Sequence, residues 1–102
     1  MYTVSLGGLA FEWDPAKAAA NRNKHGVTFN EASTAFLDEH ARIVADPEHS
    51  TDEERFVLMG MSGVLSLLVV CHCYREDDET IRILSARRAD DSEHQEYAKY
   101  LP

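Results

Sequence analysis

Two stretches of the chain carry basic side chains at spacings suited to binding phosphate groups. In the first, intervals of four and three residues place Lys17, Asn21 and Lys24 on one stripe of a helix, with His25 at its edge. Such a row could bind phosphate groups, and because histidine ordinarily titrates near neutral pH, His25 could act as an acid or a base. The alternative is a solvated helix surface whose alanines pack inward.

The second stretch is a strand pattern, IRILSARRA at 81–89, that ends in two adjacent arginines. Alternation predicts Arg87 on the same sheet face as the isoleucines, and Arg82 and Arg88 on the other face. If helices cover the isoleucine face, Arg87 lies at its rim, where a guanidinium can hold a phosphate through two hydrogen bonds. The alternative is a structural salt bridge between Arg87 and one of the aspartates that follow it.

Two further groups of residues could carry chemistry. Arg55 begins another β-rich segment and could supply a second phosphate contact. Its neighbour Glu54 could serve as a base, but a charged strand entry after an acidic loop is the better explanation of that residue. Cys71 and Cys73 flank a histidine, but no second pair of ligands at zinc-binding spacing accompanies them. We therefore expect no metal and no other cofactor, and buried free cysteine is the ordinary role of such residues.

Capping signals predict two helices near the N-terminus, after a short strand at 9–13. Asp14 is a good N-cap for the first helix, and Gly26 ends it in a left-handed conformation. Thr28 then caps a second helix, and Glu31, three residues later, would complete a capping box.

After residue 40 the pattern becomes β-rich. Four segments are rich in Val, Ile, Leu and Phe and are separated by turn signals, namely 41–45, 55–60, 64–75 and 80–87. Their short connections predict an antiparallel meander, and a last helix is expected at about 90–100. The sequence thus predicts a single α+β domain over 1–102: an antiparallel sheet of about four strands, two N-terminal helices packed on one face, and a C-terminal helix.

The formal net charge of −8, from 18 acidic and 10 basic residues, at first argues against nucleic-acid binding. However, the bases concentrate at 17–25 and 82–88, away from acidic clusters at 46–54, 76–79 and 90–96. A local basic site on an acidic body is compatible with weak, salt-sensitive RNA binding. The chain has no long apolar run and no basic signal-peptide start, so we expect a cytoplasmic protein without membrane contact.

Three motifs together resemble one known family. They are the FEWD opening at 11–14, the KHGV corner at 24–27 and the SAR strand end at 85–87. With this order and chain length, the sequence resembles the BrnT family of small bacterial toxins, which have a RelE-like ribonuclease fold. The resemblance extends from Phe11 to Tyr97.

The resemblance implies the toxin of a type II toxin–antitoxin pair that cleaves RNA without a metal. It also implies a BrnA-like antitoxin with a ribbon-helix-helix domain, through which alone the complex binds operator DNA. We expect the antitoxin to cover the basic rim formed by the first helix and the 82–88 strand end. The positions that match the family motif are Trp13, Lys17, Asn21, Lys24, His25, Gly26, Phe29, Ala32, Glu54, Arg55, Ser85, Ala86, Arg87, Glu93 and Tyr97. The chain departs from the family at His94, where arginine is usual, within a last helix that is acidic instead of basic.

These residue types fit attack of a ribose 2′-hydroxyl on the adjacent phosphate, which yields a 2′,3′-cyclic product. We expect Arg87 and Arg55 to stabilise charge, and His25, with Tyr97 as a second candidate, to transfer protons. The residues expected to bind RNA are Lys17, Asn21, Lys24, Arg82 and Arg88. The alternative is a non-enzymatic, toxin-derived domain that binds only an antitoxin and co-regulates its operon. Convergence of Lys17, Lys24, Arg55 and Arg87 in one cleft would favour the enzyme.

Overall fold

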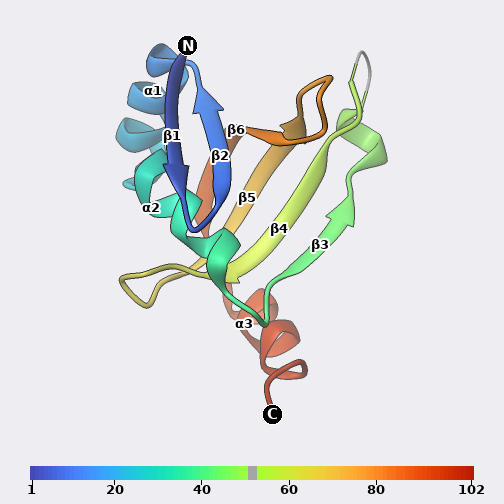
Figure 1. The fold of residues 1–102 in the computed structure, drawn as a ribbon. Coiled ribbons are helices and arrows are strands. Elements are labelled where there is room, and N and C mark those ends of the chain that lie inside the picture. Colours follow the sequence, from blue (N-terminus) through green and yellow to red (C-terminus); the bar gives the residue numbers. More distant parts are fainter. Residues whose placement is uncertain (51–52) are drawn as a thin grey trace.

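The computed structural model describes residues 1–50 and 53–102, and Figure 1 shows the arrangement of its elements. In chain order these are β1 (Tyr2–Leu6), β2 (Leu9–Trp13), α1 (Pro15–His25), α2 (Phe29–Thr34), η1 (Ala35–Leu37), β3 (Arg42–Ala45), η2 (Pro47–His49), β4 (Phe56–Met61), β5 (Leu67–Tyr74), β6 (Thr80–Arg88) and α3 (Asp91–Ala98). The α+β class and the three α-helices are confirmed.

The sheet has six strands in the order β1-β2-β6-β5-β4-β3. Strands β3 to β6 form the antiparallel meander that the sequence predicts. The expected size of about four strands is wrong, because the hairpin β1–β2 joins the sheet and makes it mixed: β2 pairs in parallel with β6, from Ala10 opposite Thr80 to Glu12 opposite Arg82. The hairpin turn uses Gly7 and Gly8, both with positive φ, a conformation that glycine adopts without steric cost.

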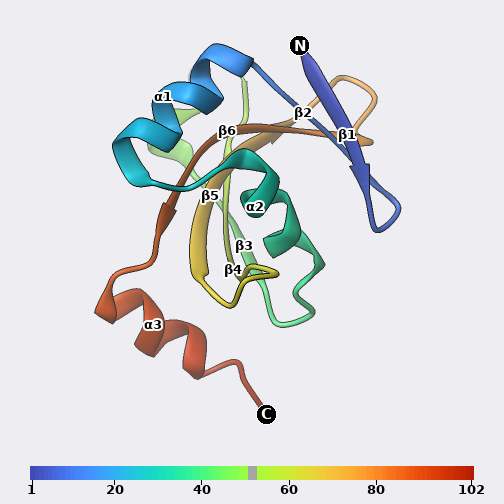
Figure 2. The same cartoon turned by 90° about the vertical axis from the view of Figure 1, so that its left-hand side faces the viewer.

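Helices α1 and α2 cover one face of the sheet (Figures 1 and 2). The Asp14 side chain accepts a hydrogen bond from the Ala16 amide at 2.8 Å, and Gly26 ends α1 with φ of 70°. Thr28 caps α2 through the Glu31 amide at 3.1 Å. The second half of the expected capping box is absent there, because the Glu31 carboxylate accepts a hydrogen bond from Ser62 at 2.8 Å instead.

The hydrophobic core lies between these helices and the sheet. Aromatic and aliphatic side chains from both layers are buried there, among them Phe11, Phe29, Leu58, Leu68, Val70, Ile83 and Ala86. Burying one such side chain stabilises the fold by about 1.5–3 kcal/mol. The helix-covered face of the sheet therefore serves to form the core. The opposite face of the meander, which we call the open face, is left for other roles.

A β-bulge decides which residues of β6 reach the open face. Cys71 pairs with Ser85 but His72 pairs with Ile83, so Leu84 is an extra residue in β6. The bulge reverses the alternation that follows it, which puts Arg87 on the open face, away from the isoleucines. The expected shared face of Arg87 and the isoleucines is therefore wrong.

Helix α3 extends from the end of the sheet opposite the N-terminus (Figure 2). A capping box between Asp90 and Glu93 starts it, and the guanidinium of Arg42 stacks on the ring of Tyr100, 3.8 Å from its centre, just beyond its end. In the described part of the chain, no helix is both long and apolar enough to cross a membrane.

Candidate functional site

Asn21 fixes α1 against the edge of β6. Strand β2 pairs with β6 only as far as Arg82, which leaves the later residues of β6 without a neighbouring strand on that side. The Asn21 amide fills this place: its oxygen accepts from the Ala86 amide at 3.0 Å, and its nitrogen donates to the carbonyls of Ala86 and Val27 at 2.8 and 3.0 Å. Both amide hydrogens are used, so the predicted surface row is interrupted at Asn21, which instead positions the helix.

Four of the expected cationic side chains, those of Lys17, Lys24, Arg55 and Arg87, line one groove on the open face. Two adjoining depressions share His25, Arg55, Cys71 and Ser85 in their linings. The first is completed by α1, which contributes Lys17 and Lys24, and the second by Arg87, Asp46 and His49. We call the two together the basic groove.

Arg55 lies in the basic groove and forms no salt bridge with the part of the chain that the structure describes. Its Nε atom is buried, and within residues 1–50 and 53–102 it has no hydrogen-bond partner and no carboxylate in salt-bridge range. A buried donor without a partner is costly, so such a group is expected to find its partner in a ligand. An anionic ligand fits best, because a guanidinium only donates hydrogen bonds.

Arg87, in contrast, is held by a carboxylate. Its two terminal nitrogens donate to the two oxygens of Glu93 at 2.8 and 2.9 Å. This hydrogen-bonded pair raises the pKa of Arg87 and lowers the pKa of Glu93, so both stay charged. The guanidinium is half-exposed and keeps N–H groups free for a second anion. The salt-bridge partner is thus on α3 itself, beyond the aspartates that the sequence suggested.

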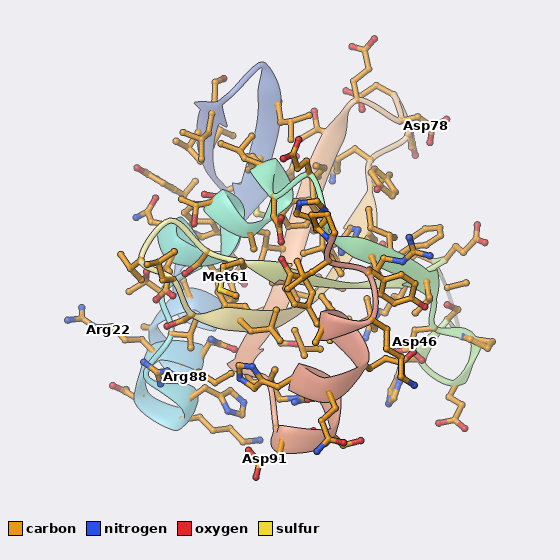
Figure 3. All side chains as sticks on the ribbon, turned by 90° about the horizontal axis from the view of Figure 1, so that it is seen from below. Arg22, Asp46, Met61, Asp78, Arg88 and Asp91 are labelled. Carbon is orange, nitrogen blue, oxygen red and sulfur yellow. The ribbon has the colours of Figure 1, made fainter. Side chains whose placement is uncertain are left out.

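The other two predicted arginines lie outside the basic groove. Arg82 donates through Nε and Nη2 to one oxygen of the buried Glu12, at 3.1 and 2.9 Å. Arg88 is on the helix-covered side of β6 and donates to the His25 carbonyl at 3.3 Å, at the end of α1. Arg22 also lies on α1 outside the groove, and its side chain extends outward (Figure 3).

Tyr97 is likewise absent from the groove lining. It is buried, and its hydroxyl donates to the carboxylate of Asp38. Burial and this contact raise the pKa of Tyr97 to about 12. Burial opposes ionisation of Asp38, but hydrogen bonds from the amides of Met61 and His40 and from Tyr97 outweigh it and lower its pKa. The pair joins α3 to the segment after η1.

Sequence reasoning missed three residues of the basic groove as site residues. Ser85 faces it because of the bulge, which alternation could not reveal. Cys71 faces it from β5, and burial raises the pKa of its thiol so that it stays protonated. His49 faces it with its Nδ1 atom 2.9 Å from a carboxylate oxygen of Asp46. The only sequence signal was the three-residue spacing of these two residues around a proline. Glu54 is exposed and lines neither depression.

The chain matches a family model over residues 13–93, described as the ribonuclease toxin BrnT of type II toxin–antitoxin systems. Among solved structures it is similar to the Brucella abortus ribonuclease toxin BrnT, with a TM-score of 0.60 and 22% sequence identity, over 79% of this chain and 96% of that one. No curated protein matches. Since the family model covers most of the sequence, the chain belongs to the BrnT family of ribonuclease toxins of type II toxin–antitoxin systems.

Proposed function

We propose that the chain cleaves RNA in the basic groove by a metal-independent, RelE-like reaction. The observation that carries this proposal is that Lys17, Lys24, Arg55 and Arg87 all line one groove, where the buried Nε atom of Arg55 has no hydrogen-bond partner among the described residues.

Each cation of the groove has a distinct part in this reaction. Arg55 and Arg87 stabilise the negative charge that develops on the phosphorus centre, and such contacts are each worth about 3 kcal/mol or a hundredfold in rate. Lys17 and Lys24, both exposed on α1, bind the flanking phosphates as point charges. His25 is in the lining of both depressions and transfers a proton.

The partner of this toxin is a BrnA-like antitoxin with a ribbon-helix-helix domain. Because the chain is strongly acidic outside the groove, it does not hold duplex DNA, and operator binding belongs to the antitoxin. The antitoxin covers the basic rim formed by α1 and the end of β6. Acidic α3, whose first residue Asp91 is exposed (Figure 3), meets basic residues of that partner and speeds their encounter.

The second candidate is a toxin-derived regulator that binds antitoxin without cleaving RNA. One observation favours it: the charge of Arg87 is already balanced by Glu93. Arg55 favours the ribonuclease, because its buried Nε atom has no hydrogen-bond partner among residues 1–50 and 53–102, and a regulator that binds no phosphate has no use for such a donor.

Expression of the chain alone in bacteria separates the two candidates. We expect growth arrest with RNA decay for the wild type and for Arg22→Ala, which removes an exposed arginine outside the groove. Arg55→Ala should grow normally while producing folded protein. Growth arrest without RNA decay, or none at all with folded wild-type protein, would contradict the proposed ribonuclease.

A further inference from the structure

Transfer of a phosphate to a 2′-oxygen needs two proton-transfer groups, one on each side of the phosphorus. The 2′-hydroxyl must lose its proton, and the departing 5′-oxygen must gain one. The proposed function supplies only His25 for this task, because Tyr97 lies outside the groove. The groove lining contains a second imidazole, His49, which comes from the other end of the meander.

His49 is oriented by its own carboxylate. It ends η2, and its Nδ1 atom is 2.9 Å from Oδ2 of Asp46, whose side chain is largely buried. An Nδ1–H that donates to a carboxylate leaves the Nε2 lone pair free and fixes the ring plane. The rest of the imidazole is exposed to the solvent that fills the groove.

The segment that carries this pair is anchored beside Arg55. The Asp46 amide donates to the Arg55 carbonyl at 2.8 Å. The Arg55 amide donates in turn to the Ser50 hydroxyl at 2.8 Å, and that hydroxyl donates to the Asp46 carbonyl at 2.7 Å. These three bonds tie both ends of the segment to the residue that precedes β4, so the His49–Asp46 pair has a fixed place beside Arg55.

We propose that His49 is the general base of the reaction and that His25 is its general acid. This inference rests on the proposed ribonuclease function and names the proton-transfer groups of the same groove. His49 Nε2 takes the proton of the 2′-hydroxyl as the 2′-oxygen bonds to phosphorus. The bond from phosphorus to the 5′-oxygen breaks, and His25 donates a proton to that oxygen. The products are a 2′,3′-cyclic phosphate and a 5′-hydroxyl end.

The carboxylate of Asp46 favours His49 over His25 as the general base. A carboxylate bonded to Nδ1 stabilises the imidazolium that forms when Nε2 accepts a proton, as in hydrolase triads. In the described part of the chain, His25 has no such carboxylate partner. The other ionisable groups that line the same depression are Arg55, Arg87 and the Cys71 thiol. The arginines stay protonated and cannot accept the proton, and the thiol has a raised pKa, which leaves His49 as the acceptor.

Two matched RNA oligonucleotides test these roles. One is unmodified, and the other carries sulfur in place of the 5′-bridging oxygen at the cleaved bond, so that its leaving group needs no proton. We expect His49→Ala to lower kcat about a hundredfold or more on both substrates. His25→Ala should lower kcat on the unmodified RNA only. His40→Ala, which removes a histidine near a different carboxylate, Glu39 at 3.7 Å, should leave both rates unchanged.

Asp46 is a positioning residue, and its variant has a different signature. We expect Asp46→Asn to lower kcat about tenfold or more on both substrates with KM and melting temperature unchanged. Cleavage of both RNAs by His49→Ala at the wild-type rate would overturn the inference and leave the ribonuclease function standing. A wild-type chain that cleaves neither RNA would overturn the proposed function and the inference with it.

Discussion

The two ends of β6 each present an arginine on the open face of the sheet, and their surroundings differ. Arg82, near the start, donates two hydrogen bonds to Glu12, whose side chain is only 11% exposed and lies in the adjacent strand. Arg87, near the end, pairs with Glu93 of the projecting helix α3 and is itself 44% exposed. The first pair lies within the sheet, whereas the second borders the basic groove.

This difference shows that the residue type alone does not give an arginine its function. Arg82 neutralises a buried carboxylate, which is a task for the fold, because an unpaired buried charge is strongly destabilising. Arg87 has solvent on one side and shares the groove lining with a second cation, Arg55. We therefore expect one end of the strand to contribute to stability and the other to the proposed phosphate chemistry.

Removal of Arg87 should have the largest effect on activity. We expect Arg87→Ala to abolish toxicity, with RNA cleavage lowered by about a hundredfold or more, because the transition state loses a charge contact worth about 3 kcal/mol. The melting temperature should change little, since the side chain is half-exposed and its loss opens no cavity. Growth assays and a thermal melt check both halves of this expectation. If the Arg87→Ala variant is toxic and as stable as the wild type, Arg87 is not part of the site. If the variant does not fold, the role of Arg87 is structural.

Removal of Arg82 should give the opposite result. Arg82→Ala leaves Glu12 with only the longer contact to Arg75 at 3.4 Å, so we expect a loss of about 2 kcal/mol in the free energy of unfolding. Cleavage per folded molecule should stay at the wild-type level, as measured by activity corrected for the folded fraction. Arg75→Ala, which removes only the longer contact, is the milder control. A stable but inactive Arg82→Ala variant would erase the distinction between the two ends.

The lysines of α1 should have a smaller effect, confined to binding. We expect Lys24→Ala to weaken RNA binding a few-fold and to reduce the slope of log affinity against log salt by about 0.7, the value for one contact with a single strand. Arg22→Ala on the same helix is the matched control, because Arg22 is exposed but lies outside the groove. If the salt-dependence slopes of the two variants are equal, a lysine in the groove contributes no more to RNA binding than an exposed arginine outside it.

Acid should weaken the attachment of α3 to the rest of the fold, and we expect this effect to be the smallest of the four predicted here. The folded-state pKa of Glu93 lies below its ordinary 4.5, because it pairs with Arg87, and that of Asp38 lies below its ordinary 3.8. Each carboxylate therefore stabilises the fold above its ordinary pKa, and this contribution is lost as the pH falls through the lowered folded value. Denaturant unfolding from pH 7 to pH 3 should show a steeper loss for wild type than for the double variant Glu93→Gln, Asp38→Asn. Parallel curves would contradict this coupling.

Local signals in the sequence predicted much of the fold. Asp14, Gly26 and Thr28 cap α1 and α2 as expected, and the four β-rich segments form the meander. The parallel attachment of β2 to β6 could not be predicted, because it joins residues about 70 positions apart and depends on the whole sheet.

The candidate site shows the same division between local and long-range signals. Lys17, Lys24 and Arg55 could be identified from residue type and spacing, and the structure brings them together. The sheet face on which Arg87 lies could not be predicted, because one bulge at Leu84 reverses the alternation of side chains. The role of Asn21 could not be predicted either, because its three hydrogen bonds form only when α1 lies along the edge of β6.

The most direct test of the basic groove is cleavage of RNA by the purified chain in the presence of a metal chelator. We expect the wild type and Arg22→Ala to produce fragments with 2′,3′-cyclic phosphate ends, and Arg55→Ala to produce them at least about a hundredfold more slowly while keeping its fold. Equal cleavage by folded Arg55→Ala, or cleavage that stops when the chelator is added, would contradict metal-independent chemistry in this groove.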